Sequence, residues 1–389
     1  MTHERNEIQG MIPKAPQHVA TIDTDTGLAE FIDRMRERDW IAIDTEFLRE
    51  RTYYPKLCLV QIADTETVGL IDVLALSDTT PLVALLVDPD VCKVFHSAEQ
   101  DLEVLYHTYG RMPAPVFDTQ IAAPLLGFDD QMGYARLIEA LLDRKLSKSH
   151  TRTDWSQRPL PAGALDYAAD DARYLSVAYR VLTRRLAEAE RLDWLADDFE
   201  RLVSPSRFHV DTRRAWRRVK ATHRLAPQAQ QIIAELADWR EQRAIESDRP
   251  RRWVLADNTI VALAENQPRS DIELADTPDL PSKTLERHGA ALLACIERGL
   301  ARPAKPLNPN AGPPDGPTKR QIKTGMNALG HAAERVDIPA SAIASRQDVA
   351  AIVAGERDGR LLQGWRASVA GQAVVDAVET AQADAAGRN

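Results

Sequence analysis

The chain contains little cysteine and no long hydrophobic run. Its three cysteines, Cys58, Cys92 and Cys295, lie far apart in 389 residues, and this number and spacing argue against a disulfide framework or a zinc cluster. No segment approaches the roughly 20 apolar residues that a helix needs to cross a bilayer, and the polar first residues do not resemble a secretory signal. We therefore expect a protein of the reducing cytoplasm that has no membrane partner.

Length and composition indicate a globular protein with two or three domains. A single hydrophobic core seldom extends over as many as 389 residues. The apolar fraction of 44% and the charged fraction of 28% are ordinary for a folded chain, and no internal repeat is visible. Composition alone therefore selects no functional class.

The charge is unevenly distributed. The net charge of −9 disfavours a nucleic-acid partner at first, but residues 201–253 hold 13 lysines and arginines against 6 aspartates and glutamates. Residues 144–158 hold five basic side chains against one acidic side chain. Each basic segment fits either a solvated helix face or a surface that binds phosphates, and both interpretations stay open at this point.

Strand and helix patterns alternate over the first 200 residues. The expected strands are 40–47, 57–63, 67–73, 91–95 and 116–118, and the expected helices are 79–87, one after Ser97 and one around 121–126. The short connection 64–66 predicts a hairpin, and Ser97 is placed to cap the helix that follows it. We expect an α/β fold in which a mixed sheet is flanked by helices. Beyond about residue 200 the sequence predicts amphipathic helices, interrupted by a linker at 303–317 that holds six prolines.

Two carboxylates end the first apolar strand pattern. Asp44 and Glu46 are two positions apart, so a strand directs both side chains to one face. Burial of two like charges raises the pKa of both unless a cation neutralises them, and Mg²⁺ or Mn²⁺ with oxygen ligands would do so. The alternative is a pair of solvated acids at a strand terminus.

Three further side chains extend this interpretation. Asp101 lies early in the helix after strand 91–95, and it approaches the Asp44 pair if that strand lies beside strand 40–47. Tyr167 and Asp171 are four residues apart in a helix that opens near Pro161 and share one face. A dipole-stabilised acid at Asp101 and a half-buried, solvated hydroxyl at Tyr167 are the alternatives.

The pattern as a whole resembles the tyrosine-containing branch of the DEDD exonucleases, and within it the ribonuclease D family. The resemblance covers about residues 20–200 and rests on the following strings: Ile43–Phe47 with Arg49-Glu50 and Tyr53-Tyr54-Pro55, His96–Leu102, Asp154-Trp155-Ser156, Arg158-Pro159-Leu160, and Tyr167-x3-Asp171. Of the adjacent acids Asp170 and Asp171, the family spacing selects Asp171. Trp239-Arg240-Glu241, Arg249–Leu255 and Asp257 resemble an HRDC domain.

This resemblance implies an RNase H-like exonuclease domain at 1–205, an HRDC domain at 206–302 and, after the linker 303–317, a second HRDC-like helical unit at 318–389. It implies a monomeric 3′-5′ exoribonuclease that releases 5′-mononucleotides from tRNA precursors and other structured RNAs. A DNA exonuclease of the same superfamily and a non-catalytic RNA-binding scaffold are the alternatives, and the HRDC-like units are equally compatible with docking of a protein.

The resemblance also assigns roles to single residues. Asp44, Glu46 and Asp171 would hold one of two Mg²⁺ or Mn²⁺ ions, and Asp44 and Asp101 would hold the other. Tyr167 would orient the attacking water. The expected substrate-binding residues are Phe47 and Leu48 beyond the acidic pair, and Lys148, Arg152 and Arg158 in the first basic segment.

Overall fold

The computed structural model describes residues 12–147, 150, 153–220, 222–308 and 315–386. The chain divides into two compact units. Unit 1 comprises Met1–Leu48, Leu57–Arg207 and Pro314–Asn389, and unit 2 comprises Arg49–Lys56 and Phe208–Pro313. Among the described residues, no helix is both long and apolar enough to cross a membrane.

Unit 1 is built on a six-stranded mixed sheet, as the sequence predicts. The strands, in spatial order, are β1 (His18–Ile22), β4 (Thr67–Ile71), β3 (Lys56–Ala63), β2 (Trp40–Leu48), β5 (Cys92–Phe95) and β6 (Val116–Asp118). The predicted hairpin is present, because β3 and β4 pair antiparallel and the Asp64 N–H donates to the Thr67 carbonyl at 3.1 Å. The pairs β1/β4, β2/β5 and β5/β6 are parallel. Strand β1 lies outside the predicted set.

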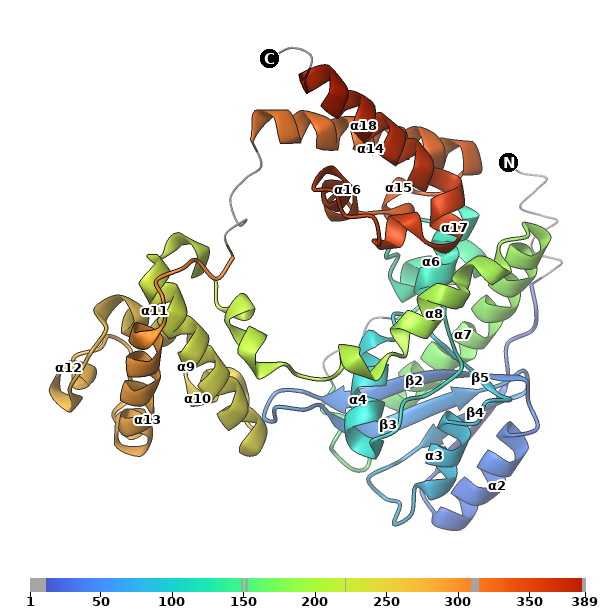
Figure 1. Cartoon of the computed structure of the whole chain (residues 1–389). Helices are drawn as coiled ribbons and strands as arrows, with labels where there is room; N and C mark the ends of the chain where they lie inside the picture. The colour runs from blue at the N-terminus through green and yellow to red at the C-terminus, as the bar shows by residue number, and fades with distance from the viewer. Residues whose placement is uncertain (1–11, 148–149, 151–152, 221, 309–314, 387–389) are drawn as a thin grey trace. The chain divides into compact units, whose positions relative to one another are not determined.

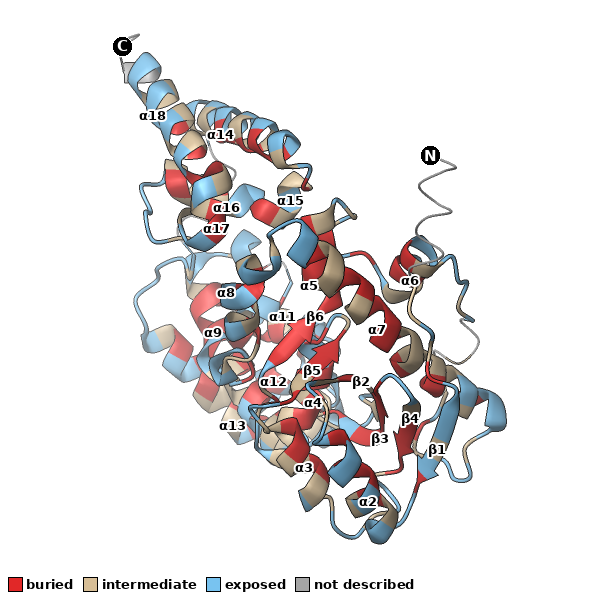
Figure 2. Ribbon diagram, turned by 90° about the vertical axis from the view of Figure 1, so that its right-hand side faces the viewer, coloured by how far each residue is buried: buried red, intermediate tan, exposed pale blue. Residues whose placement is uncertain are grey.

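Helices cover both faces of this sheet (Figure 1). Helices α2 (Asp25–Met35) and α3 (Thr80–Leu86) lie on one side and the long α7 (Ala162–Glu188) on the other. Gly69 in β4 permits close packing of α2, because a Cβ there would overlap the Phe31 ring. On the opposite face α7 presents fully buried alanines, which allow its backbone to approach the strands closely. Strands β3 to β6 and the inner side of α7 are accordingly buried, whereas the edge strand β1 is largely exposed (Figure 2).

The cap of α4 (Glu99–Tyr109) differs from the prediction. Ser97 does not cap this helix; it has φ 61° and precedes the N-cap residue Ala98. The carboxylate of Asp118, at the end of β6, accepts hydrogen bonds from the N–H groups of Ser97 at 3.0 Å and Ala98 at 2.8 Å. The prediction was wrong because this capping side chain comes from a neighbouring strand.

The helix expected around residues 121–126 is divided into two short pieces. They are α5 (Thr119–Ala122) and a 3₁₀ turn at Ala123–Leu126. Pro124 lies in the first turn of the 3₁₀ piece, and because proline lacks an N–H it cannot continue an α-helical hydrogen-bond ladder. Helix α6 (Tyr134–Leu142) follows.

The last helices of the chain pack within unit 1. They include α14 (Gly316–Val336), α16 (Arg346–Val353) and α18 (Gln372–Ala386), and their apolar side chains share one core with α7 and the sheet. Trp365 stacks on Trp194 with 4.8 Å between ring centroids. The Arg191 guanidinium donates to the carbonyls of Leu125 and Val336 at 2.5 and 2.7 Å.

Unit 2 is helical in its described part, as the sequence predicts beyond residue 200. Its helices are α9 (Pro227–Glu246), α10 (Arg251–Val254), α11 (Asp257–Asn266), α12 (Asp271–Ala275) and α13 (Ser282–Ala301). Gly299 brings α13 against the backbone of Ile232 in α9. The loop 49–56 belongs to this unit, because the Tyr53 hydroxyl donates to the buried carboxylate of Glu241 at 2.5 Å. Arg218 and Arg251 neutralise the same carboxylate at 2.8 and 2.7 Å.

Candidate active site

Three carboxylates from two elements meet on the α7 side of the sheet. Asp44 and Glu46 alternate along β2 and so leave one face of the strand. Asp171 comes from α7, which covers that face. Ligand oxygens of the three residues all lie within 4.8 Å of one another, and all three residues are partly exposed. The structure therefore brings together the pair and the helix residue that the sequence singled out.

The electrostatics of this group are unfavourable without a cation. Burial, reinforced by repulsion from Asp171, raises the pKa of Asp44 well above its usual range. Burial and the charge of Asp44 raise the pKa of Glu46 to about 10, and burial raises the pKa of Asp171 to about 7. The charged neighbours that raise these three pKa values are all carboxylates. They fit a divalent cation, since hard cations prefer several carboxylate oxygens.

Asp101 lies beside this group without belonging to it. Because β5 pairs parallel with β2, α4 starts beside the carboxylate end of β2, as the sequence interpretation required. Asp101 is buried and accepts a hydrogen bond from the Thr45 hydroxyl at 2.5 Å. Burial and repulsion from Asp44 raise its pKa well above the ordinary value. Asp101 therefore adds a fourth negative group next to the three.

Tyr167 lies one turn before Asp171 on the same face of α7. Its hydroxyl is hydrogen-bonded to the Asp171 carboxylate, and burial raises its pKa above the usual value for tyrosine. Two aromatic rings flank it, Trp155 at 6.4 Å and His150 at 6.1 Å between ring centroids. Asp170 instead forms an ion pair with Arg173, which agrees with the choice of Asp171 from the sequence spacing.

The structure adds neighbours that sequence reasoning missed. The Tyr134 hydroxyl donates to the backbone carbonyl of Asp171 at 2.5 Å, and its ring lies 5.4 Å from that of His96. Burial lowers the pKa of His96 to about 4, so this imidazole is neutral at pH 7. No local signal marks Tyr134, which is 37 residues from Asp171. For Thr45 the sequence offers one indication of a role at the site, because it lies between Asp44 and Glu46.

The predicted substrate-binding residues have different outcomes. Phe47 and Leu48 follow Glu46 at the end of β2 and are half-buried, while Lys148 and Arg152 lie outside the described residues. Arg158 needs a correction. Its guanidinium donates to both oxygens of Asp72 and to the carbonyls of Cys58, Trp155 and Gln157. These contacts occupy all five N–H groups of an arginine, so none is left for a phosphate.

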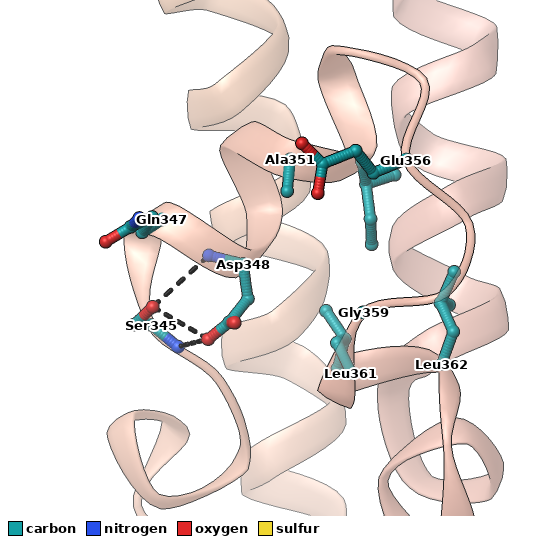
Figure 3. A pocket seen from close by; sticks show the side chains of 9 residues that line it. Ser345, Gln347, Asp348, Ala351, Glu356, Gly359, Leu361 and Leu362 are labelled. Carbon is teal, nitrogen blue, oxygen red and sulfur yellow. Dashed lines mark hydrogen bonds between the residues drawn. The ribbon is translucent and has the colours of Figure 1, made fainter. Parts of the chain in front are cut away.

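A pocket in the C-terminal helices contains a different kind of acidic residue (Figure 3). Asp348 and Glu356 lie at its wall beside Leu361 and Leu362. The Asp348 carboxylate accepts from both the backbone N–H and the hydroxyl of Ser345 at 2.7 Å, which makes a capping box for α16. Ser345 is the N-cap residue of α16, and Asp348 completes its capping box, so this carboxylate is engaged in holding the start of the helix.

Two family models match the chain. The model described as a 3′-5′ exonuclease matches residues 19–187, which include Asp44, Glu46, Asp101, Tyr167 and Asp171. The model of the HRDC domain matches residues 229–296, within unit 2.

Whole proteins match over nearly the full length. Ribonuclease D of Zymomonas mobilis is 38% identical over 374 residues, covering 93% of this chain and 94% of that protein. Ribonuclease D of Pseudomonas paraeruginosa is 36% identical over 378 residues, covering 95% of this chain and all of that protein. The crystal structure of Escherichia coli RNase D, described as an exoribonuclease involved in structured RNA processing, matches with a TM-score of 0.81 and 31% identity, covering 94% of this chain and 99% of that one.

Proposed function

The chain belongs to the ribonuclease D family of 3′-5′ exoribonucleases, and from this premise we propose that it matures the 3′ ends of tRNA precursors and other structured RNAs by two-metal hydrolysis. The observation that carries the chemistry is the group of carboxylates from Asp44, Glu46 and Asp171, whose ligand oxygens lie within 4.8 Å of one another. Carboxylates this close together are neutralised either by protons or by a cation. A divalent cation bound there would enable hydrolysis of a phosphodiester.

We assign the metal ligands by analogy with the family, and the group of three carboxylates supports the first of the two ions. Asp44, Glu46 and Asp171 would hold one Mg²⁺ or Mn²⁺ ion, and Asp44 together with Asp101 would hold a second. When bound, the divalent ions would supply electrostatic stabilisation of the attacking and leaving oxygens at the scissile phosphate. The hydrogen bond from Thr45 to Asp101 keeps that carboxylate oriented toward the end of β2.

Tyr167 has an orienting role in this proposal. Its raised pKa makes the phenol a poor base at neutral pH. As a neutral hydroxyl bonded to Asp171, it can instead hold the attacking water in line with the scissile bond. Phe47 and Leu48, directly beyond Glu46, would pack against the terminal bases. Cleavage of the last linkage then releases a 5′-mononucleotide and leaves a new 3′-hydroxyl.

Unit 2 would provide affinity for the body of the RNA. Arg213 and Lys220 are exposed beside its helical core, and lysines and arginines that contact phosphates bind structured RNA by shape rather than by sequence. We keep the domain division 1–205, 206–302 and 318–389, the monomeric state and the cytoplasmic location as parts of this proposal. The double variant Arg213→Ala/Lys220→Ala should raise KM for a structured RNA and leave cleavage of a dinucleotide unchanged.

The decisive experiment uses the full chain and a tRNA precursor with a short 3′ extension, labelled at its 5′ end. We expect stepwise shortening that requires Mg²⁺ or Mn²⁺ and a free 3′-hydroxyl, and nucleoside 5′-monophosphates as products. A matched DNA oligonucleotide should be a poorer substrate. Internal cleavage, preference for DNA, or full activity of Asp44→Ala would overturn the proposal, and no heat of Mn²⁺ binding in calorimetry would favour a non-catalytic scaffold.

Truncation after about residue 201 is a poor test of the C-terminal segments. It would remove Arg366 and Trp365, which contact Asp198 and Trp194 in the core of unit 1. Loss of activity would then report unfolding rather than loss of RNA binding. Surface substitutions in unit 2 separate the two effects.

A further inference from the structure

Gln61 is a buried polar side chain without a protein partner. It lies in β3 and has no exposed surface. Neither its Oε1 nor its Nε2 has a hydrogen-bond partner among the described residues. Because both atoms lack a hydrogen-bond partner, the amide stays unsatisfied whichever end carries the oxygen. An unsatisfied buried amide lowers the stability of the folded state. A glutamine at this position therefore indicates either a hydrogen-bond partner outside the protein or a function.

Buried glutamines elsewhere in the chain are satisfied. In unit 2 the Gln230 amide donates to the Leu225 carbonyl at 2.9 Å and accepts from the Leu307 N–H at 3.0 Å. The Gln231 amide donates to the Lys305 carbonyl at 2.6 Å. Gln61 differs from both of them, although it is the most deeply buried of the three.

The register of the sheet places Gln61 on the same face as the carboxylates. Ile62 pairs with Gly69, and Gly69 faces Phe31 of α2. Neighbouring residues of a strand point to opposite faces, so Gln61 faces α7. Asp44 and Glu46 face α7 from β2, the strand beside β3 in the sheet. The flanking residues Leu59 and Ala63 belong to the core that the sheet shares with α7.

We propose that Gln61 is a positioning residue of the metal site, whose amide holds a buried water that hydrogen-bonds the carboxylates of β2. A buried water typically makes about three hydrogen bonds to otherwise unsatisfied polar groups, and a glutamine amide offers both donors and acceptors. The water would restrict the orientation of the carboxylates before the ions bind. This inference rests on the proposed function, because it concerns the same site.

The test replaces Gln61 with methionine, which is similar in size and has no amide. Loss of the outer hydrogen bonds of metal ligands typically weakens metal binding by about 10–100-fold. We expect Gln61→Met to bind Mn²⁺ at least tenfold more weakly in calorimetry, and to show a lower kcat with an unchanged KM for RNA. Cooperative thermal unfolding of the metal-free variant would show that the weaker Mn²⁺ binding is not a loss of the fold. Native Mn²⁺ affinity in a folded Gln61→Met would overturn the inference.

Two further variants keep the test decisive if Gln61→Met folds poorly. Gln61→Glu keeps the length of the side chain and an oxygen that can still hold the water, so it should bind Mn²⁺ more tightly than Gln61→Met. Binding no tighter than that of Gln61→Met would overturn the inference, because the two variants differ in the polar group that would hold the water. Thr277→Val, at a buried hydroxyl without a partner among the described residues of unit 2, should change thermal stability without changing Mn²⁺ affinity. Asp44→Ala separates the two proposals, because its full activity overturns the function and leaves Gln61 unassigned.

Discussion

Unit 1 contains carboxylates removed from full solvent exposure in two places, one beside arginines and one beside other carboxylates. At Asp198 the protein provides the cations itself. Its carboxylate accepts from Arg366 at 2.8 Å, Arg201 at 2.8 Å and Arg360 at 3.0 Å. Burial opposes ionisation of Asp198, but the guanidinium of Arg366 and its neighbours hold the pKa below the usual value.

At the end of β2 the charged neighbours that shift the pKa values of the carboxylates are other carboxylates. Burial raises the pKa of Asp44, Glu46 and Asp171, and repulsion from neighbouring carboxylates adds to the effect. The ion pair between Asp198 and Arg366 links the C-terminal helices to α8 (Ala196–Leu202). At the end of β2 the ionised form of the carboxylates is disfavoured without a bound cation. Low exposure of an acid therefore does not distinguish structure from function in this molecule, whereas the sign of the charges around it does.

The largest expected effect separates chemistry from folding. Asp44→Ala or Asp171→Asn removes a metal ligand and should lower kcat by at least about a thousandfold, roughly 4 kcal/mol of transition-state stabilisation. The metal-free variants should unfold at or above the temperature of the native protein, because a repulsion has been removed. Parallel exonuclease assays and thermal unfolding measure both quantities. Loss of both activity and fold would show that these acids stabilise the structure, against the comparison above.

The opposite result is expected at the other acid. Asp198→Ala leaves the nearly buried Arg366 without its carboxylate, and removal of one partner of a buried ion pair costs about 3–5 kcal/mol. Urea unfolding should show this loss, while kcat of the folded variant at low temperature stays native. The control is Arg201→Ala at a guanidinium that is 41% exposed, for which about 0–1 kcal/mol is expected. Equal losses in the two variants would argue against a central role for the buried pair.

A smaller loss of kcat is expected at Tyr167, where the substitution removes only one hydroxyl group. Tyr167→Phe keeps the ring between Trp155 and His150 and removes the bond to Asp171. If the hydroxyl only orients water, kcat should fall about 10–100-fold, roughly 1.4–2.7 kcal/mol, without a change in Mn²⁺ affinity by calorimetry. A fall as large as that of Asp44→Ala would indicate that Tyr167 takes part in proton transfer.

The sequence predicted the elements of the site because its information there is local. The period of two in β2 put Asp44 and Glu46 on one face, and the period of a helix put Tyr167 beside Asp171. The mixed sheet, the hairpin 64–66 and the helical second half are confirmed for the same reason. The assignment of catalytic roles to these residues stays a prediction.

What the sequence did not predict depends on contacts between distant segments. Asp118 rather than Ser97 caps α4, because β6 lies beside β5. The Arg158 guanidinium donates to the carboxylate of Asp72, which is 86 residues away in the sequence. Its charge in a basic segment indicated phosphate binding, and nothing local showed that its donors are engaged. Gln61 lies in an apolar segment, and nothing in that segment indicated that its amide lacks a hydrogen-bond partner.

The smallest effect is a dependence of metal-free stability on pH. Burial raises the pKa of Asp171 from 3.8 to about 7 and that of Glu46 from 4.5 to about 10. Above pH 4 the folded protein therefore holds protons that the unfolded chain has released, so rising pH destabilises the folded state. The Asp171 contribution is lost progressively between about pH 4 and pH 7, and that of Glu46 continues toward pH 10. We expect the unfolding temperature without metal to be measurably lower at pH 8 than at pH 5.

The slope of this dependence identifies its origin. Asp171→Asn should show a shallower fall over the same range, because its side chain does not titrate. Saturating Mn²⁺ should abolish the fall in the native protein, because the ion stabilises the ionised carboxylates that repel one another without it. Scanning calorimetry at several pH values, with and without Mn²⁺, measures all three curves. Identical slopes for the native protein and Asp171→Asn would mean that the raised pKa of the β2–α7 acids does not control stability, and the contrast with Asp198 would then rest on catalysis alone.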